Sequence, residues 1–228
     1  MLRTFTIVDP EVHTKSLVQD GTLVEAGSLL AIVTGSARSL LAAERVALNL
    51  LGQLSGVATA TRELVDQIAG TSASLVDTRK TVPGLRALQK AAVQAGGGQN
   101  HRMGLYDAVL IKDNHIAVAG SPEAAVKQAR DAVGPGTSIE IEVESTEQLE
   151  AAIAAGADIV MLDNMSVNEM REAVLITDGR CRTEASGGIT IATIREVAKT
   201  GVDMISVGWL THSAPALDVA LDLEYLEG

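Results

Sequence analysis

The sequence predicts an α/β fold in which parallel strands form a barrel of eight strands or fewer. Beyond Gly70, short β-branched runs alternate with helical segments in units of roughly 20 to 35 residues, which is typical of a parallel sheet. Nearly every predicted strand ends in polar residues, and in a (β/α) barrel all strand carboxyl ends meet at one mouth. An open sheet would spread these residues along an edge, and no G-x-G-x-x-G motif follows an early strand. We therefore favour the barrel over a dinucleotide-binding fold.

The part of the chain before Gly70 has a different pattern. Residues 1 to about 35 contain the short runs TFTIVD, SLVQDGTLVEAG and SLLAIVTG, separated by glycines, which predicts small antiparallel strands rather than helices. Ser36 is a suitable N-cap for a helix over SARSLLAAERVALNLLGQLSG, where leucines recur at roughly helical spacing. A second helix is expected over 57–69.

The strand and helix units then follow one another to the end of the barrel. The expected strands are SLVD, AVLIKD, SIEIEVE, DIVMLD, CRTEAS and DMISVG. The helices between them are expected to begin at Pro83, Pro122, Thr146, Val167 and Ile191. Proline is favoured at the first helical position because the N–H that it lacks has no partner there.

Composition excludes several classes of protein. The formal net charge is −11 and aromatic residues make up only 2%, which argues against binding to nucleic acid or to an anionic membrane. Cys181 is the single cysteine, so no disulfide or cysteine-based metal site forms within one chain. No apolar run approaches the roughly 18 residues of a membrane span, and no signal peptide is visible. We expect a cytoplasmic protein.

The most informative stretch runs from Asp77 to His115, because it is cationic within an acidic protein. It contains Arg79, Lys80, His101, Arg102 and Lys112, arranged around a Gly96-Gly97-Gly98 turn. Arginine forks suit carboxylates, and glycines let the backbone approach an anion closely. The alternative is that these cations pair with neighbouring glutamates, but they are too many in too little sequence for pairing alone. The stretch predicts a site for a small, highly charged anion.

Other basic residues of this region are expected to play lesser roles. Arg86 and Lys90 lie four apart on a predicted helix, so we expect them on a solvated face. His115 is interpreted as a structural hydrogen-bonding residue and His13 as a surface residue. His212 follows a glycine turn near the end of the barrel and is an intermediate case.

The strand SIEIEVES carries three carboxylates, Glu140, Glu142 and Glu144, two residues apart and therefore on one face. On a buried strand they need cations or a metal to neutralise them, whereas on an exposed edge strand they would be solvated. Flanking helices on both sides favour burial. Asp163 ends the next strand, so Glu142 and Asp163 together are a candidate Mg²⁺ site.

Two turns of small residues, ASGGIT (185–190) and SVGWLTHS (206–213), lie between a strand and a helix near the end of the barrel. Such turns leave backbone N–H groups free, and the last two loops of barrels commonly bind phosphate. The alternative is that their glycines are ordinary left-handed turn residues. Together with the cations and carboxylates, these turns predict a polycarboxylate substrate and a phosphorylated partner.

These motifs, in their order, resemble the quinolinate phosphoribosyltransferase family. The stretches that match are DTRKTVPGLRALQKAAV, GGGQNHRMGLYDAVLIKDNH, IEVES, VMLDN, ASGGI and VGWLTHS, within a resemblance from about Gly21 to Asp218. The resemblance implies a partly open (β/α) barrel with a small N-terminal α+β sandwich domain. The expected domains are 1–70, the barrel at 71–212, and a segment at 213–228 that returns to the N-terminal domain.

The resemblance also implies an activity and an assembly. The activity is phosphoribosyl transfer from phosphoribosyl pyrophosphate (PRPP) to quinolinate with decarboxylation, which gives nicotinate mononucleotide, pyrophosphate and CO₂ in de novo NAD biosynthesis. The cofactor implied is Mg²⁺. The assembly implied is a homodimer or a higher homo-oligomer, in which Arg45 reaches into the neighbouring subunit's site.

Site roles follow from the matched motifs. Arg79, His101, Arg102 and Lys112 look like quinolinate-binding residues, with Lys80 close by. Glu142 and Asp163 resemble the residues near the PRPP ribose and Mg²⁺, and with Lys112 they form the expected catalytic set. Ser186, Gly187, Gly188, Gly208 and His212 resemble the loop that binds the 5′-phosphate.

The chain departs from the family pattern in two places. Family members usually carry further residues before the position of Thr4, so the N-terminal domain is expected to be truncated. Trp209 stands where a small residue is usual, and its ring either narrows the phosphate pocket or turns outward. Two other functions therefore stay open: a related transferase with another substrate, and a non-catalytic barrel that binds phosphate or a partner subunit.

Overall fold

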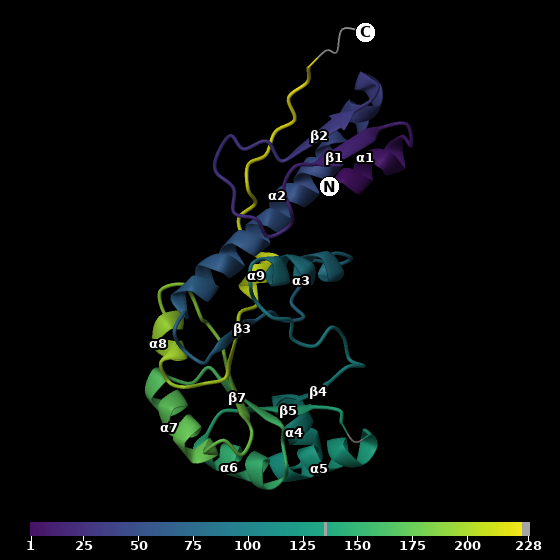
Figure 1. Cartoon of the computed structure of the whole chain (residues 1–228). Coiled ribbons are helices and arrows are strands. Elements are labelled where there is room, and N and C mark those ends of the chain that lie inside the picture. The colour runs from purple at the N-terminus through teal and green to yellow at the C-terminus, as the bar shows by residue number, and fades with distance from the viewer. Residues whose placement is uncertain (135, 225–228) are drawn as a thin grey trace.

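The computed structural model describes residues 1–134 and 136–224. A long helix, α2 (Ala37–Gln67), joins two parts of the molecule (Figure 1). One end of α2 carries a small unit of α1 (Leu2–Val8), β1 (His13–Ser16) and β2 (Ala31–Thr34). The other end packs against a six-stranded parallel sheet surrounded by helices. Within the described residues, no helix combines the length and apolarity needed to cross a membrane.

The N-terminal unit matches the prediction only in part. Strands β1 and β2 pair antiparallel, with His13 opposite Thr34 and Ser16 opposite Ala31. The run TFTIVD, predicted as a strand, instead belongs to α1. Phe5 of α1 is only 2% exposed and packs with Val12 and with residues of α2, so one anchoring side chain decides the conformation of this segment. His13 is exposed, as predicted.

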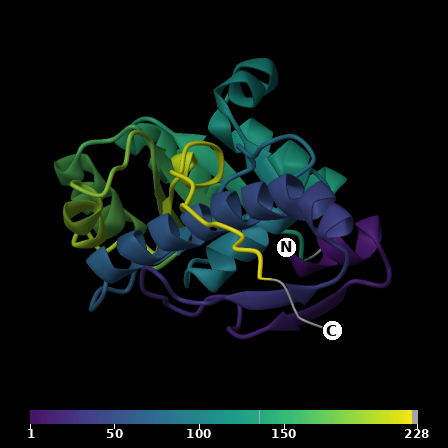
Figure 2. The same ribbon diagram turned by 90° about the horizontal axis from the view of Figure 1, so that it is seen from above.

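Helix α2 is one continuous helix of 31 residues and not the predicted pair. Ser36 is its N-cap, as predicted, and its side chain accepts a hydrogen bond from the Ser39 backbone N–H at 3.2 Å. Gly56, where the first helix was expected to end, lies inside α2. It makes room for the C-terminal segment, since a Cβ there would overlap the Pro215 carbonyl oxygen. Leu217 donates its N–H to the Gly52 carbonyl at 2.9 Å, and Figure 2 shows this yellow segment running along α2.

The sheet forms the predicted partly open barrel. Its strands are β3 (Ser74–Val76), β4 (Val109–Ile111), β5 (Ile139–Val143), β6 (Ile159–Asp163), β7 (Arg182–Ser186) and β8 (Met204–Ser206). They pair in the order β3-β8-β7-β6-β5-β4, and every pair is parallel. Among the described residues, β3 and β4 at the two ends of this order share no ladder, so the barrel is open between them.

The helices that cover the sheet follow the predicted order with shifted starts. They are α3 (Arg86–Ala95), α4 (Asp113–Ala119), α5 (Pro122–Ala132), α6 (Thr146–Ala154), α7 (Val167–Thr177), α8 (Ile194–Ala198) and α9 (Trp209–His212). The predicted starts at Pro122, Thr146 and Val167 are confirmed. Helix α3 starts three residues after Pro83 because Gly84 has a φ of 80°, a left-handed conformation that no helix can contain. The short helix α4 was missed.

Alternation along β5 separates the core from the barrel interior. Ile139, Ile141 and Val143 are fully buried in the main hydrophobic cluster with side chains of the covering helices. Glu140 and Glu142 alternate with them, so they point to the other side of the sheet, into the barrel. Strand β5 pairs with β4 and with β6, so the alternative of an exposed edge strand is wrong. The fold thereby places carboxylates inside the barrel.

Candidate functional site

A cavity of about 970 Å³ lies at the carboxyl ends of the barrel strands. It brings together nearly all the residues that the sequence predicted for a site. Those that line it are Arg79, Lys80, His101, Arg102, Lys112, Glu142, Asp163, Ser186, Gly187, Gly188, Gly208 and His212. They lie at the carboxyl ends of the six strands or shortly after them, apart from His101 and Arg102, which lie between α3 and β4. The parallel barrel is therefore the main reason that residues a hundred positions apart share one cavity.

Arg45 is the exception among the predicted site residues. It lies on α2, its side chain is 81% exposed, and its guanidinium pairs with the neighbouring Glu44 at 3.1 Å. It does not line the cavity of its own chain. Within one chain, the structure leaves this arginine out of the site.

The Gly96-Gly97-Gly98 turn was predicted to approach an anion, and this is wrong. None of the three glycines lines the cavity. They lie between α3 and α2, where a Cβ at Gly96 would overlap the Ala58 carbonyl oxygen and one at Gly98 would lie 2.8 Å from the Thr61 methyl. The glycines are needed for the close packing of two helices, which a local pattern does not distinguish from an anion-binding turn.

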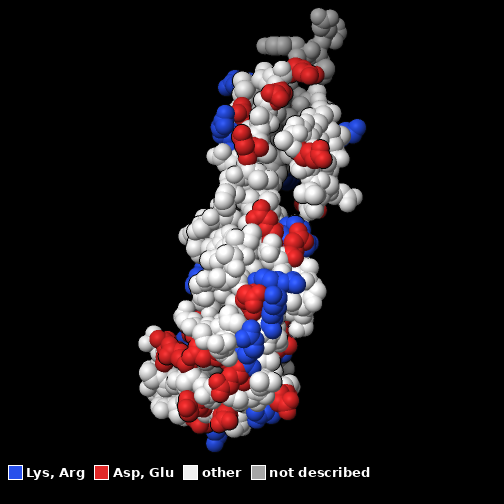
Figure 3. Space-filling model, turned by 90° about the vertical axis from the view of Figure 1, so that its left-hand side faces the viewer, with Lys and Arg blue, Asp and Glu red and all other residues white. Residues whose placement is uncertain are grey.

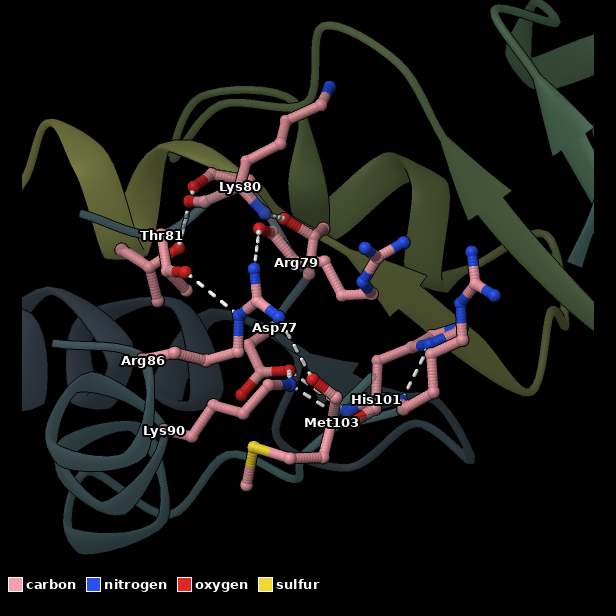
Figure 4. Close-up of polar contacts among 12 residues, drawn as sticks. Asp77, Arg79, Lys80, Thr81, Arg86, Lys90, His101 and Met103 are labelled. Atoms are coloured by element: carbon pink, nitrogen blue, oxygen red, sulfur yellow. Dashed lines mark hydrogen bonds and ion pairs between the residues drawn. The ribbon is translucent and has the colours of Figure 1, made fainter. Parts of the chain in front are cut away.

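Arg86 and Lys90 were predicted on a solvated face, and this is also wrong. Lys90 and Asp77 are both fully buried and form an ion pair (Figure 4). The Lys90 ammonium also donates to the His101 carbonyl at 2.9 Å, and Asp77 accepts the His101 backbone N–H at 2.9 Å. Burial raises the pKa of Asp77, although the hydrogen bond from Lys90 opposes that rise. This pair attaches the segment around His101 to the end of β3.

The guanidinium of Arg86 ties together the loops on either side of the same network. It donates to the Thr81 hydroxyl at 3.0 Å and to the Met103 carbonyl at 3.2 Å (Figure 4). It also reaches the Arg79 carbonyl at 3.3 Å. Arg86 therefore holds the backbone from which Arg79 extends.

His101 reaches across the barrel interior to two buried carboxylates. Its Nε2 lies 2.9 Å from Glu140 and 3.3 Å from Glu184, both of which are almost completely buried. These are the three residues, within the described chain, whose potential ligand atoms lie within 4.8 Å of one another. Burial raises the pKa of Glu140 to about 7, while the hydrogen bond from His101 opposes the rise.

Two features of His101 favour opposite protonation states. Burial disfavours its charge, but the hydrogen bonds to Glu140 and Glu184 outweigh burial and raise the pKa of His101 to about 10. Its Nδ1, however, accepts the backbone N–H of Arg102 at 2.8 Å, and a proton on Nδ1 would set two N–H groups against each other. The contacts therefore describe a ring with its proton on Nε2 and a lone pair on Nδ1.

The cations of the cavity are close enough to influence one another. Arg102 is half-buried, and its burial together with the charge of Arg79 lowers its pKa. The Nε of Arg79 is buried and has no hydrogen-bond partner among the described residues. Arginine pairs with unmet donors are suited to bind a carboxylate that enters the cavity.

The acidic side of the cavity is formed by β5 and β6. Glu142 forms an ion pair with Lys112 at the end of the neighbouring strand β4, and Asp163 accepts a hydrogen bond from the Asn164 amide at 2.7 Å. Both carboxylates are hard oxygen donors of the kind that Mg²⁺ prefers, so the residues fit the ion. If the ion bound here, these two carboxylates would leave its other positions to substrate oxygens and water.

The two small-residue turns lie side by side at the cavity. Gly187 and Gly188 have φ of 98° and 60°, and a Cβ at Gly187 would overlap the Asn164 side chain. In the second turn, Gly208 lies against Lys80, whose carbonyl accepts the Thr211 hydroxyl at 2.7 Å. The first turn needs glycine for its conformation at both positions and for space at Gly187, whereas Gly208 has an ordinary φ of −73°. They do not open directly onto long helices, since α8 begins at Ile194 and α9 has four residues.

Several cavity residues were missed or left undecided by the sequence reasoning. Glu184 and Asn164 were missed, although Glu184 lies two residues before Ser186 and so shares its face of β7. Asn164 carries the weaker signal of an asparagine directly after a strand, where a φ of 55° is tolerated.

Trp209 lines the cavity and packs against the barrel core. His115 accepts the Lys112 backbone N–H at 2.9 Å, which confirms its structural role.

The charge distribution outside the cavity is mixed. On the face shown in Figure 3, acidic groups lie along the whole length of the molecule and basic groups gather near the middle of the barrel. This agrees with the formal net charge of −11. The cavity therefore gathers cationic side chains within a protein whose net charge is negative.

Comparison with known proteins gives a consistent result for both parts of the chain. The family model described as quinolinate phosphoribosyl transferase, C-terminal domain, matches residues 57–222, and the model of the N-terminal domain matches residues 1–55. A probable nicotinate-nucleotide pyrophosphorylase [carboxylating] of Bacillus subtilis (strain 168) is 48% identical over 219 residues, which cover 96% of this chain and 76% of that protein.

Two further relatives agree with these matches. A nicotinate-nucleotide pyrophosphorylase [carboxylating] of Mycobacterium leprae (strain TN) is 48% identical over 209 residues, which cover 90% of this chain and 73% of that protein. The crystal structure of NadC from Streptococcus pyogenes superposes with a TM-score of 0.94 at 44% identity, and covers 99% of this chain and 80% of that one.

Replacement of Lys90 by Met is expected to lower the free energy of unfolding by about 3–5 kcal/mol, because it leaves the buried Asp77 carboxylate without its cation. Chemical denaturation measures the change. Combining Lys90→Met with Asp77→Asn is expected to recover part of the loss, and Lys127→Met, at an exposed position, is the matched control. Losses that simply add in the double variant would contradict the coupling.

Proposed function

The chain belongs to the quinolinate phosphoribosyltransferase family, and from this premise we propose that its cavity transfers the phosphoribosyl group of PRPP to quinolinate. The transfer is accompanied by loss of CO₂ and gives nicotinate mononucleotide and pyrophosphate, a step of NAD biosynthesis. The protein is accordingly a pentosyltransferase. The observation that carries the proposal is the cavity in which four cationic side chains, an acidic pair and two glycine turns meet.

The cationic side of the cavity suits quinolinate, which carries two adjacent carboxylates on a pyridine ring. Arg79 and Arg102 present planar forks that match carboxylates, and Lys112 adds a point charge. The unmet Nε of Arg79 supports this assignment, because a buried donor without a partner is costly until an acceptor arrives. His101 contributes through the arrangement of Arg102, whose backbone N–H it accepts.

The other side of the cavity suits PRPP. Ser186, Gly187, Gly188, Gly208 and His212 surround a space for the 5′-phosphate. Glu142 and Asp163 are the residues that would hold Mg²⁺, which supplies positive charge for the phosphate oxygens when it is bound. Lys112 already forms an ion pair with Glu142, so it joins the carboxylate-binding side to the metal-binding side.

The chemistry follows from holding the two substrates against each other. The pyridine nitrogen forms a bond to the ribose C1 as the C1–oxygen bond to pyrophosphate breaks, through a centre with oxocarbenium character. Fixed cations stabilise the charge on the departing pyrophosphate, and orientation removes much of the entropic cost. The pyridinium then accepts the electron pair of the C2–carboxylate bond, CO₂ leaves, and a proton from water replaces it at C2.

The assembly proposed is a homodimer in which Arg45 completes the partner's site. Arg45 extends into solvent from α2. On the same helix, Leu41 is 53% exposed and Val46 is 56% exposed. Exposed apolar side chains beside an exposed arginine are suited to an interface with a second copy.

Purified protein supplied with quinolinate, PRPP and Mg²⁺ is expected to form nicotinate mononucleotide, which chromatography detects. Removal of Mg²⁺ by EDTA should abolish product, because the pyrophosphate charge is then poorly neutralised. Nicotinate in place of quinolinate serves as the specificity control. Turnover with nicotinate and none with quinolinate would assign a different substrate, and no turnover by a cooperatively folded sample would refute the activity.

Replacement of Arg102 by Ala is expected to lower kcat/KM by roughly two to three powers of ten, because loss of a buried partner for a charged group costs on the order of 2–5 kcal/mol. Steady-state kinetics measures the effect. Arg171→Ala, on the exposed surface of α7, is the matched control and should retain activity. Normal activity in the Arg102 variant would remove this residue from the site.

Mixing two inactive variants tests the role of Arg45. Arg45→Ala and Arg102→Ala are each expected to be nearly inactive, whereas an equal mixture that has exchanged subunits should regain about one quarter of wild-type activity. Half of the dimers are then mixed, and one of their two sites has both arginines. An arginine that acts only within its own subunit predicts no recovery, and full activity of Arg45→Ala alone predicts no role.

A further inference from the structure

The single tryptophan of the chain occupies a position between the two glycine turns. Trp209 is the first residue of α9, its ring is half-buried against the barrel core, and it lines the cavity. Its indole Nε1 donates a hydrogen bond to the Ile189 carbonyl at 3.1 Å. Ile189 itself is only 6% exposed and belongs to the same core, so both ends of this bond are anchored.

Each turn is otherwise tied to a different part of the barrel. The turn at 208–212 is attached to the β3 side, where the Thr211 hydroxyl donates to the Lys80 carbonyl at 2.7 Å and Gln89 donates to the Thr211 carbonyl at 2.6 Å. The turn at 186–190 is attached to the β6 side, where Asn164 donates its N–H to the Ser186 carbonyl at 2.9 Å. Where the two turns leave β7 and β8, the Ser206 hydroxyl donates to the Ala185 carbonyl at 3.4 Å. Beyond that point, within the described part of the chain, the indole bond is the one hydrogen bond that joins 187–190 to 208–212.

The turn that receives this bond has little stiffness of its own. Gly187 and Gly188 are consecutive and both have positive φ, and glycine backbone is the most free to change conformation. Beyond them, Thr190 bonds only locally, to Thr193 at 3.0 Å. The donor fixed in the neighbouring turn therefore adds to the core packing of Ile189 in holding the glycine pair at a set distance from Gly208.

We propose that Trp209 is a positioning residue, which locks the two turns together and so preforms the end of the cavity that receives the phosphate of PRPP. The part that names PRPP rests on the proposed function, whereas the locking of the turns does not. A preformed turn spends less of the binding free energy on ordering its own backbone. Trp209 thereby favours binding of the phosphate-bearing substrate without contact with quinolinate.

The variant Trp209→Phe tests this, because phenylalanine keeps an aromatic ring in the core and removes only the indole donor. It is expected to raise the KM for PRPP by about 3- to 10-fold, the size of effect that one hydrogen bond produces. The KM for quinolinate and kcat are expected to change by less than about 2-fold. Trp209→Leu, which also removes the ring, reports the additional contribution of packing.

Hydrogen exchange of the ligand-free protein tests the locking by itself. Amides of residues 187–190 are expected to exchange faster in Trp209→Phe than in the wild type, while amides of α5, none of whose residues lines the cavity, keep their rates. Unchanged exchange at 187–190 would overturn the proposal. Equal increases of KM for both substrates would also overturn it, because that result indicates general loss of structure. If the wild-type protein shows no turnover, the proposed function is refuted. The hydrogen-exchange result then still decides whether Trp209 locks the two turns together.

Discussion

The buried ion pair of Asp77 and Lys90 is the interaction on which the cationic half of the site depends. Asp77 follows β3, Lys90 lies on α3, and both bond to the backbone of His101. Three segments are thereby fixed to one another at a point where the barrel lacks a ladder between β3 and β4. A buried pair of this kind is a weak source of net stability, but removal of either partner leaves an uncompensated buried charge.

From this point the polar network extends across the barrel. His101 connects the open side to Glu140 on β5 and to Glu184 on β7, and the backbone N–H of Arg102 bonds to its ring. Lys112, which follows β4, forms a similar contact nearer the carboxyl end of the strands, where it pairs with Glu142 on β5. The interior carboxylates therefore hold Lys112 and His101 in place before any substrate arrives, and His101 in turn holds the backbone of Arg102. This is the preorganisation that electrostatic catalysis requires.

The long helix α2 attaches the small N-terminal unit to the barrel. Its glycines at 52 and 56 admit the backbone of the C-terminal segment, so helix and segment run together from the barrel toward β1 and β2. One rigid helix carries Arg45 away from the cavity of its own chain. Because α2 holds the two parts of the chain apart, Arg45 stays exposed to solvent, as the proposed role in a partner's site requires.

Local patterns in the sequence determined most of the architecture. Alternation of residues on SIEIEVES, the strand and helix rhythm beyond Gly70 and the glycine turns predicted the parallel barrel, the succession of its strands and most of its helices along the chain, and residues that line its mouth. These features can be seen in the sequence because hydrophobic periodicity and turn-forming residues depend on neighbours only a few positions away. Only the tertiary structure decided that Lys90 is buried, that the three glycines at 96–98 separate two helices, that α2 is continuous, and that His101 meets Glu184. Each of these depends on a partner far away in the chain, and no local pattern carries the identity of that partner.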